Sequence, residues 1–196
     1  MTRKEDKRKR KTKSAVCNAV MTLLTKKSLD KISIKEISEE ADINRATFYL
    51  HFNDAKEVVD YIEEYASNRI KEVLSSYENF SDIKNNPYSL IKEFGTELVS
   101  NPGACSYILG TDYISSPNSK IKQTLIDGLL ELALKEFPRI EKSSVEISLS
   151  FMIAGSLEAY KTWMQSENQS SFEEVCFILS NLFKYGSASI FPGEQT

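Results

Sequence analysis

The pattern of hydrophobic and polar positions along the chain predicts helices from one end to the other. Between residues 16 and 24, hydrophobic side chains recur at spacings of three and four, which places them on one face of an amphipathic helix. A connector is expected over 79–86, where no such stripe is present. We therefore expect an all-α fold. Further helices are predicted over the segments 54–77, 87–100, 102–114, 120–137, 144–165 and 171–185.

Residues 33–52 predict two short helices joined by a tight turn. Ser33 and Glu36 have the spacing of a capping box, and Asn44 is a favourable N-cap for the second helix. Asp42, between the helices, is one of the few non-glycine residues that tolerate a left-handed turn position. This arrangement is a helix-turn-helix whose recognition helix starts near Asn44. The side chains left pointing outward are Arg45, Ala46, Thr47 and Tyr49.

The same stretch resembles the signature of the TetR family of bacterial transcriptional regulators. The matching residues are Ala-Asp-Ile-x-Arg-x-Thr-Phe-Tyr-x-His-Phe-x-Asp, from Ala41 to Asp54, and the similarity extends over about residues 13–65. The chain has Asp42 where the family usually has Gly, and Ala55 followed by Lys56 where the family usually has Lys. The resemblance implies an N-terminal three-helix DNA-binding domain, a larger helical effector-binding domain and a homodimer. The last two predicted helices are the expected C-terminal two-helix dimerisation element.

The resemblance also implies roles for individual side chains. Arg45, Ala46 and Tyr49 would face the major groove, and Thr47 and His51 would contact phosphates. The partner is expected to be a near-palindromic double-stranded DNA operator. The complete predicted DNA-binding set is Lys35, Asn44, Arg45, Ala46, Thr47, Tyr49, His51 and Lys56.

Charge is distributed unevenly and supports contact with a polyanion at one end of the chain. Residues 1–56 hold 14 Lys and Arg against 8 Asp and Glu, a net charge of +6, whereas residues 57–196 have a net charge of −9. We expect a flexible basic arm over 1–13 that lies along phosphates or in the minor groove, with a plain solvated tail as the alternative. The helix-turn-helix domain is predicted over 14–56 and the helical effector-binding and dimerisation domain over 57–196.

The last two predicted helices have more hydrophobic surface than one core requires. Residues 145–157 are hydrophobic on nearly all sides, and Ala154-Gly155-Ser156 would let another helix approach closely. Two such helices predict a two-fold, four-helix interface between two copies, with a single thick core as the alternative. The predicted interface residues are Phe151, Ala154, Gly155, Val175, Leu179 and Leu182.

Aromatic side chains of the acidic part of the chain are candidates for an effector pocket between helices, although such residues also form ordinary cores. The effector itself is unknown from sequence. The predicted lining residues are Tyr61, Tyr65, Phe94, Tyr107, Phe151, Tyr160 and Trp163.

The sequence does not favour catalysis or metal binding. His51 is the only histidine, no residues around it form a plausible catalytic triad, and no Cys-x-x-Cys spacing is present. Three scattered cysteines are typical of idle thiols in a reducing cytosol, with redox sensing as the alternative. We expect no enzyme activity, no cofactor, no metal, no membrane association and a cytoplasmic location.

The function predicted from sequence is that of a homodimeric DNA-binding regulator, a repressor released by a small-molecule effector. One alternative is a co-regulator or activator that acts through a protein partner. Another is a ligand or redox sensor with little DNA binding. The sequence does not identify the operator, the regulated genes or the sign of regulation.

Overall fold

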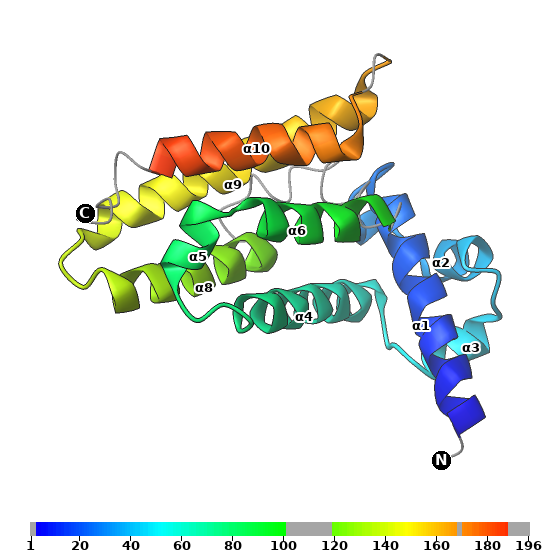
Figure 1. Ribbon diagram of the computed structural model, residues 1–196. Coiled ribbons are helices and arrows are strands. Elements are labelled where there is room, and N and C mark those ends of the chain that lie inside the picture. The colour runs from blue at the N-terminus through cyan, green and yellow to red at the C-terminus, as the bar shows by residue number, and fades with distance from the viewer. Residues whose placement is uncertain (1–2, 101–118, 168–169, 188–196) are drawn as a thin grey trace. The chain divides into compact units, whose positions relative to one another are not determined.

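The computed structural model describes residues 3–100, 119–167 and 170–187, and every regular element in these ranges is a helix (Figure 1). The all-α prediction is therefore confirmed for the described residues. The chain forms two compact units, and the division between them falls after Ala66, within helix α4 (Ala55–Leu74). The helix expected over 102–114 lies outside the described residues.

The first unit is built around the predicted helix-turn-helix. It contains α1 (Arg3–Leu24), the short 3₁₀ helix η1 (Leu29–Lys31), α2 (Ile34–Glu40), α3 (Arg45–Tyr49) and the first part of α4. Its core is hydrophobic and continuous, because one face of each helix contributes to it. Side chains with no exposed surface mark its centre: Val16, Val20, Ile37, Phe48 and Val58.

The structure corrects the extent of the first helix. Helix α1 begins at Arg3, so residues 3–13 form its first three turns. Lys and Arg are good helix formers, and the helix nucleus anchored by Val16 and Val20 can propagate toward the N-terminus through them. The basic residues are therefore presented on a helix.

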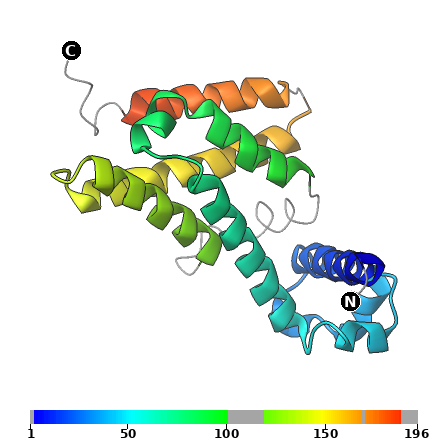
Figure 2. The ribbon, with the colours of Figure 1, turned by 60° about the horizontal axis from the view of Figure 1, so that its bottom comes forward.

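The second unit is a bundle made from the end of α4 and five described helices. These are α5 (Phe80–Asn85), α6 (Tyr88–Ser100), α8 (Lys120–Glu136), α9 (Lys142–Gln165) and α10 (Phe172–Ser187). Helix α9 packs beside both α8 and α10, and α10 also packs on α6 (Figures 1 and 2). The buried side chains at its centre include Leu129, Ala133, Val145, Leu149 and Cys176.

Two elements of this unit differ from expectation. The segment expected to be a connector contains helix α5, with Phe80 and Ile83 fully buried and Glu136 of α8 accepting the Ser81 amide hydrogen at 2.9 Å. Helix α9 starts two residues earlier than predicted, because the Glu141 carboxylate caps it by accepting from the Ser144 amide at 3.0 Å. In both cases a glutamate carboxylate satisfies amide groups at a helix start.

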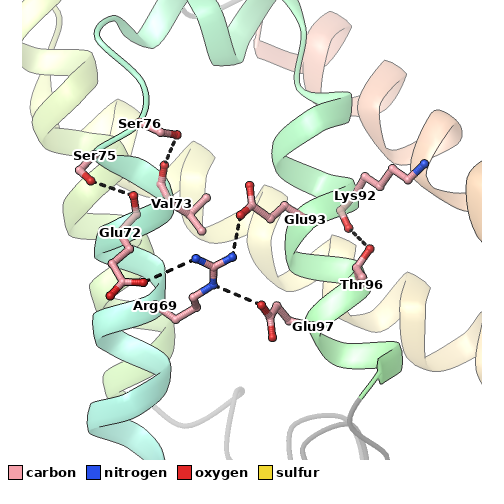
Figure 3. A network of polar contacts seen from close by, with 9 residues as sticks. All are labelled: Arg69, Glu72, Val73, Ser75, Ser76, Lys92, Glu93, Thr96 and Glu97. Atoms are coloured by element: carbon pink, nitrogen blue, oxygen red, sulfur yellow. Dashed lines mark hydrogen bonds and ion pairs between the residues drawn. The ribbon is translucent and has the colours of Figure 1, made fainter.

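An ion-pair network ties the second-unit part of α4 to α6 (Figure 3). The Arg69 guanidinium donates to Glu93 Oε1 at 3.0 Å and to Glu97 Oε1 at 3.2 Å, both on α6, and lies 3.5 Å from Glu72 on its own helix. One planar guanidinium thus contacts three carboxylates, an arrangement that fixes orientation better than a single surface pair does.

Candidate nucleic-acid interface

The start of α2 is fixed by a complete capping box. The Ser33 hydroxyl accepts from the Glu36 amide at 3.3 Å, and the Glu36 carboxylate accepts from the Ser33 amide at 3.0 Å. Lys27 donates to the other oxygen of that carboxylate at 2.5 Å. The hydrogen bond from Lys27, followed by those from Ser33, lowers the pKa of Glu36 to about 2. The predicted capping box is confirmed, with Lys27 as an additional partner.

The turn that follows α2 has the predicted left-handed residue. Asp42 has φ 51°, the only positive φ among the non-glycine residues described. The Ile43 amide then donates back to Ser38 O at 2.9 Å, which closes the turn. The chain therefore reverses within three residues and positions Asn44 at the start of α3.

Helix α3 is held at its first turn and along its inner face. The Asn44 side chain accepts from the Ala46 amide at 2.9 Å, as predicted for an N-cap. Phe48 is fully buried and its ring meets that of Phe52 at 6.1 Å between centroids. The Tyr49 ring stands edge-on to Phe48 at 5.6 Å. The orientation of α3 is thus set by its buried aromatic face.

The opposite face of α3 is open to solvent. Arg45, Ala46 and Tyr49 are exposed, and Tyr49 keeps 58 % of its surface accessible. Thr47 and His51 are half-buried at the side of the helix. The predicted residues outside α3 are also accessible: Lys35 on α2 and Lys56 on the first turn of α4 are exposed, as is Asn44. The first unit brings the whole predicted set onto one compact domain.

Basic groups from α1 approach the end of this motif, a feature that sequence analysis did not assign. Lys13 Nζ lies 4.4 Å from the centre of the Tyr61 ring and 5.3 Å from that of Phe52, a pair of cation–π contacts. Desolvation, followed by the charges of Lys13 and Lys9, lowers the pKa of His51. Lys13 of α1 thus lies beside the end of the motif, where its positive charge favours contact with phosphate.

Leu50 is a second residue that the sequence analysis missed. It is the C-cap of α3 and keeps 79 % of its surface exposed. Its position between two predicted DNA-binding residues, Tyr49 and His51, was a signal available in the sequence.

The residues predicted to line an effector pocket are dispersed in the structure. Tyr61 and Tyr65 are exposed and belong to the first unit, and Tyr107 lies outside the described residues. Phe151 is 78 % exposed on α9, so it faces away from the bundle core. Phe94, Tyr160 and Trp163 remain within the bundle of the second unit.

Tyr160 has a specific environment in the bundle. Its hydroxyl donates to Ile91 O at 3.0 Å and lies 3.5 Å from Cys176 Sγ, and its ring stacks on Phe172 at 6.4 Å. Gly95 of α6 lies directly against the Tyr160 hydroxyl, where no side chain larger than hydrogen fits without movement. These contacts join α6, α9 and α10.

The predicted dimer residues divide into two groups. Phe151, Ala154, Gly155 and Leu182 are exposed. Val175 and Leu179 are buried in their own bundle, because they lie on the same stripe of α10 as Cys176 and Phe183, which faces the core. The assignment of Val175 and Leu179 to a partner-facing surface is therefore corrected. The large hydrophobic side chains exposed on α9 and α10 are Ile147, Phe151, Phe177, Ile178, Leu182 and Tyr185.

Two cysteines have an environment that disfavours oxidation. Burial raises the pKa of Cys17 to about 12 and also raises the pKa of Cys176. The thiolate is the reactive form, so both thiols are poorly suited to redox sensing. Cys105 lies outside the described residues.

No group of three or more His, Cys, Asp or Glu side chains within the described ranges is placed to bind a metal ion. Among the described residues, no helix has both the length and the hydrophobicity needed to span a bilayer.

Comparison with known proteins agrees with this geometry. Residues 18–62 match the family model described as bacterial regulatory proteins, tetR family. No curated protein sequence matches the chain. The matched segment contains α2, the turn, α3 and the start of α4.

Several solved structures share the fold. A Clostridium perfringens protein, by name a fatty acid metabolism regulator, has a TM-score of 0.64 at 16 % identity, over 88 % of this chain and 97 % of its own. The transcriptional regulator FadR from Bacillus subtilis, solved in complex with stearoyl-CoA, has a TM-score of 0.60 at 16 % identity and the same coverage. A transcriptional regulator from Aquifex aeolicus has a TM-score of 0.57 at 22 % identity, over 92 % of this chain and 99 % of its own.

Residues 18–62 carry the match to this family, so the resemblance to the TetR family is confirmed over the segment that contains the helix-turn-helix. At these identities the likeness to solved structures shows the fold alone, a helix-turn-helix unit followed by a helical bundle, over 88 % and 92 % of this chain.

Proposed function

We propose that the chain is a homodimeric repressor that binds a near-palindromic operator through α3 and is released by a small-molecule effector. The observation that carries the proposal is the exposed face of α3, which two capped helix starts and a left-handed turn hold in a fixed orientation. The proposed DNA-binding domain is 14–56, preceded by the basic segment 1–13, and the effector-binding and dimerisation domain is 57–196. A regulator of this kind would act in the cytoplasm, where the DNA lies.

Base recognition is assigned to the exposed face of α3. Arg45, at the first helical position, is the residue whose bidentate donor geometry suits the O6 and N7 atoms of guanine. Tyr49 lies one turn further on the same face. Thr47, His51, Lys35 and Lys56 would contribute mainly phosphate contacts, which hold the register but carry no sequence information.

The two stripes of exposed hydrophobic side chains on α9 and α10 support a dimer. Ile147 and Phe151 on α9 are one turn apart, and Ile178 and Leu182 on α10 have the same spacing. Exposed hydrophobic surface of this extent marks an interaction site, and a self-complementary two-fold contact between two helix pairs would cover it. Two copies of α3 could then enter successive major grooves about 34–36 Å apart.

We further propose that the effector binds in the second unit, near Phe94, Tyr160 and Trp163. A long-chain acyl-CoA is the first compound to test, because a structure with this fold was solved with stearoyl-CoA bound. Release of DNA requires two conformations of the dimer that differ in the spacing between the two α3 helices. The effector must bind the conformation that does not fit DNA more tightly than the one that does. The test is a thermal shift with stearoyl-CoA: stabilisation that grows with ligand concentration is expected, and an unchanged melting temperature would exclude stearoyl-CoA as the effector.

Selection from a pool of random-sequence DNA duplexes tests the proposed function. The full-length chain should enrich one near-palindromic site whose two half-sites lie about one helical turn apart. Enrichment of a single unpaired half-site would contradict the dimer, and no enrichment above an unrelated helical protein would contradict sequence-specific DNA binding.

A further inference from the structure

The end of helix α3 presents a hydrophobic tip that the proposed contacts do not use. Leu50 is 79 % exposed, the highest value among the large hydrophobic side chains of the described residues. Its backbone amide already donates a hydrogen bond to Phe48 O, so this amide does not explain a contact with another molecule. With most of its surface exposed, the Leu50 side chain contributes little to the packing of the first unit.

Helix geometry shows where this tip points. Successive residues in an α-helix are rotated by about 100°, so residues two positions apart lie on nearly opposite sides. Phe48 is fully buried and defines the inward direction, and both Ala46 and Leu50 are two positions from it. Leu50 keeps helical backbone angles (φ −72°, ψ −12°), so the rotation continues through it. Ala46 and Leu50 therefore both lie on the side of the helix that faces away from the core of the first unit.

The surroundings of this tip indicate its partner. Arg45 and Tyr49 are exposed beside this tip on the same helix, and the segment 1–56 has a net charge of +6. A hydrophobic protein partner would have to cover these charges, whereas duplex DNA would complement them. In the major groove, the hydrophobic group presented by the base edges is the 5-methyl group of thymine.

We infer that Leu50, together with Ala46, contacts a thymine 5-methyl group in each half-site and is a specificity-determining residue of this regulator. The inference rests on the proposed function. It adds a hydrophobic element to readout by Arg45: the arginine would select guanine, and the Ala46–Leu50 tip would select a thymine nearby in the same half-site.

A double-mutant cycle between protein and DNA tests the inference. The selected duplex is prepared with thymine replaced by deoxyuridine, one position at a time and symmetrically in both half-sites, which removes only the methyl group. At one position the parent protein should lose roughly fourfold in affinity per half-site, the equivalent of one buried methyl group. Leu50→Ala should bind the thymine duplex more weakly and show little further loss with deoxyuridine at that position.

Two controls keep the outcomes separate. Leu50→Ala is expected to fold as the parent does, since the side chain is exposed, and circular dichroism checks this. Val99→Ala, an exposed hydrophobic change on α6 of the second unit, should respond to every deoxyuridine as the parent does. If parent and Leu50→Ala lose the same affinity at all positions, or the selected half-sites have no constant thymine, the inference is wrong while DNA binding stands. If the parent selects no duplex at all, the proposed function fails, and this inference with it.

Discussion

The side-chain oxygen of Asn44 accepts a hydrogen bond from the amide of Ala46 at 2.9 Å, and this contact sets the first turn of α3. An N-cap of this kind is worth about 1 kcal/mol. Asn44→Ala should therefore lower the free energy of unfolding of the first unit by about that amount and weaken DNA binding. Urea unfolding followed by circular dichroism measures the first effect, and fluorescence anisotropy with a labelled operator the second.

The matched control is Asn44→Asp, which keeps an oxygen acceptor at the cap. It should unfold close to the parent. Equal stability of Asn44→Ala and the parent would show that the cap contributes nothing to α3.

The pKa of Glu36, lowered to about 2, predicts a dependence of stability on pH. Because the folded state holds the carboxylate ionised, its contribution is fully present above the ordinary pKa of 4.5 and is lost as pH falls from 4.5 toward 2. Glu36→Gln should be less stable than the parent at pH 7, and the difference should shrink as the pH approaches 2. Urea midpoints at pH 7, 4.5 and 3 measure this.

Glu39→Gln is the control on the same helix, since Glu39 lies 3.8 Å from Lys35 and caps no helix start. A difference between Glu36→Gln and the parent that stays constant from pH 7 to pH 3 would refute the role assigned to the Glu36 carboxylate.

Gly95 should not tolerate a methyl group, although alanine is the better helix former. In an open helix Gly→Ala is stabilising by about 0.5–1 kcal/mol. At Gly95 the new Cβ would overlap the Tyr160 hydroxyl and come within 2.8 Å of its Cζ. Overpacking of this kind costs about 1–3 kcal/mol, so Gly95→Ala should melt at a lower temperature. The double variant with Tyr160→Phe should be less destabilised than the sum of the single changes; simple additivity would argue against the contact.

Substitutions at two leucines on α10 distinguish the core of the bundle from the proposed dimer interface. Leu182 is 66 % exposed and Leu179 is 5 % exposed. Leu182→Lys should shift the chain from dimer to monomer in sedimentation equilibrium, since a charge would enter the proposed interface. Leu179→Ala should instead lower the free energy of unfolding by about 2–5 kcal/mol, as for a core leucine. Leu182→Lys with the sedimentation behaviour of the parent would mean that this face of α10 is not the interface.

The parts of the fold that the sequence predicted are those with local causes. Ser33, Asp42 and Asn44 each act on amides or dihedral angles within a few residues, so the turn and both helix starts were readable. Helix α5 could not be predicted in this way, because the Ser81 amide in its first turn donates to Glu136, which is 55 residues away in the sequence.

Other differences have the same origin in tertiary contacts. The α10 sequence is hydrophobic on several sides, so periodicity alone did not separate buried Leu179 from exposed Leu182. The exposure of Leu50 follows from the burial of Phe48, which only the packed first unit reveals. Helical continuation of α1 through residues 3–13 was also hidden, since like charges suggested a separate arm.

The most direct test of the account is the affinity of Arg45→Ala for the selected operator, measured by anisotropy at one salt concentration beside the parent. We expect a loss of about 1–3 kcal/mol of binding free energy and a relaxed preference at one base pair of each half-site. Arg139→Ala, which removes an exposed arginine from the connection between α8 and α9, should bind as the parent does. If Arg45→Ala binds with the affinity and sequence preference of the parent, the exposed face of α3 is not the surface that reads DNA.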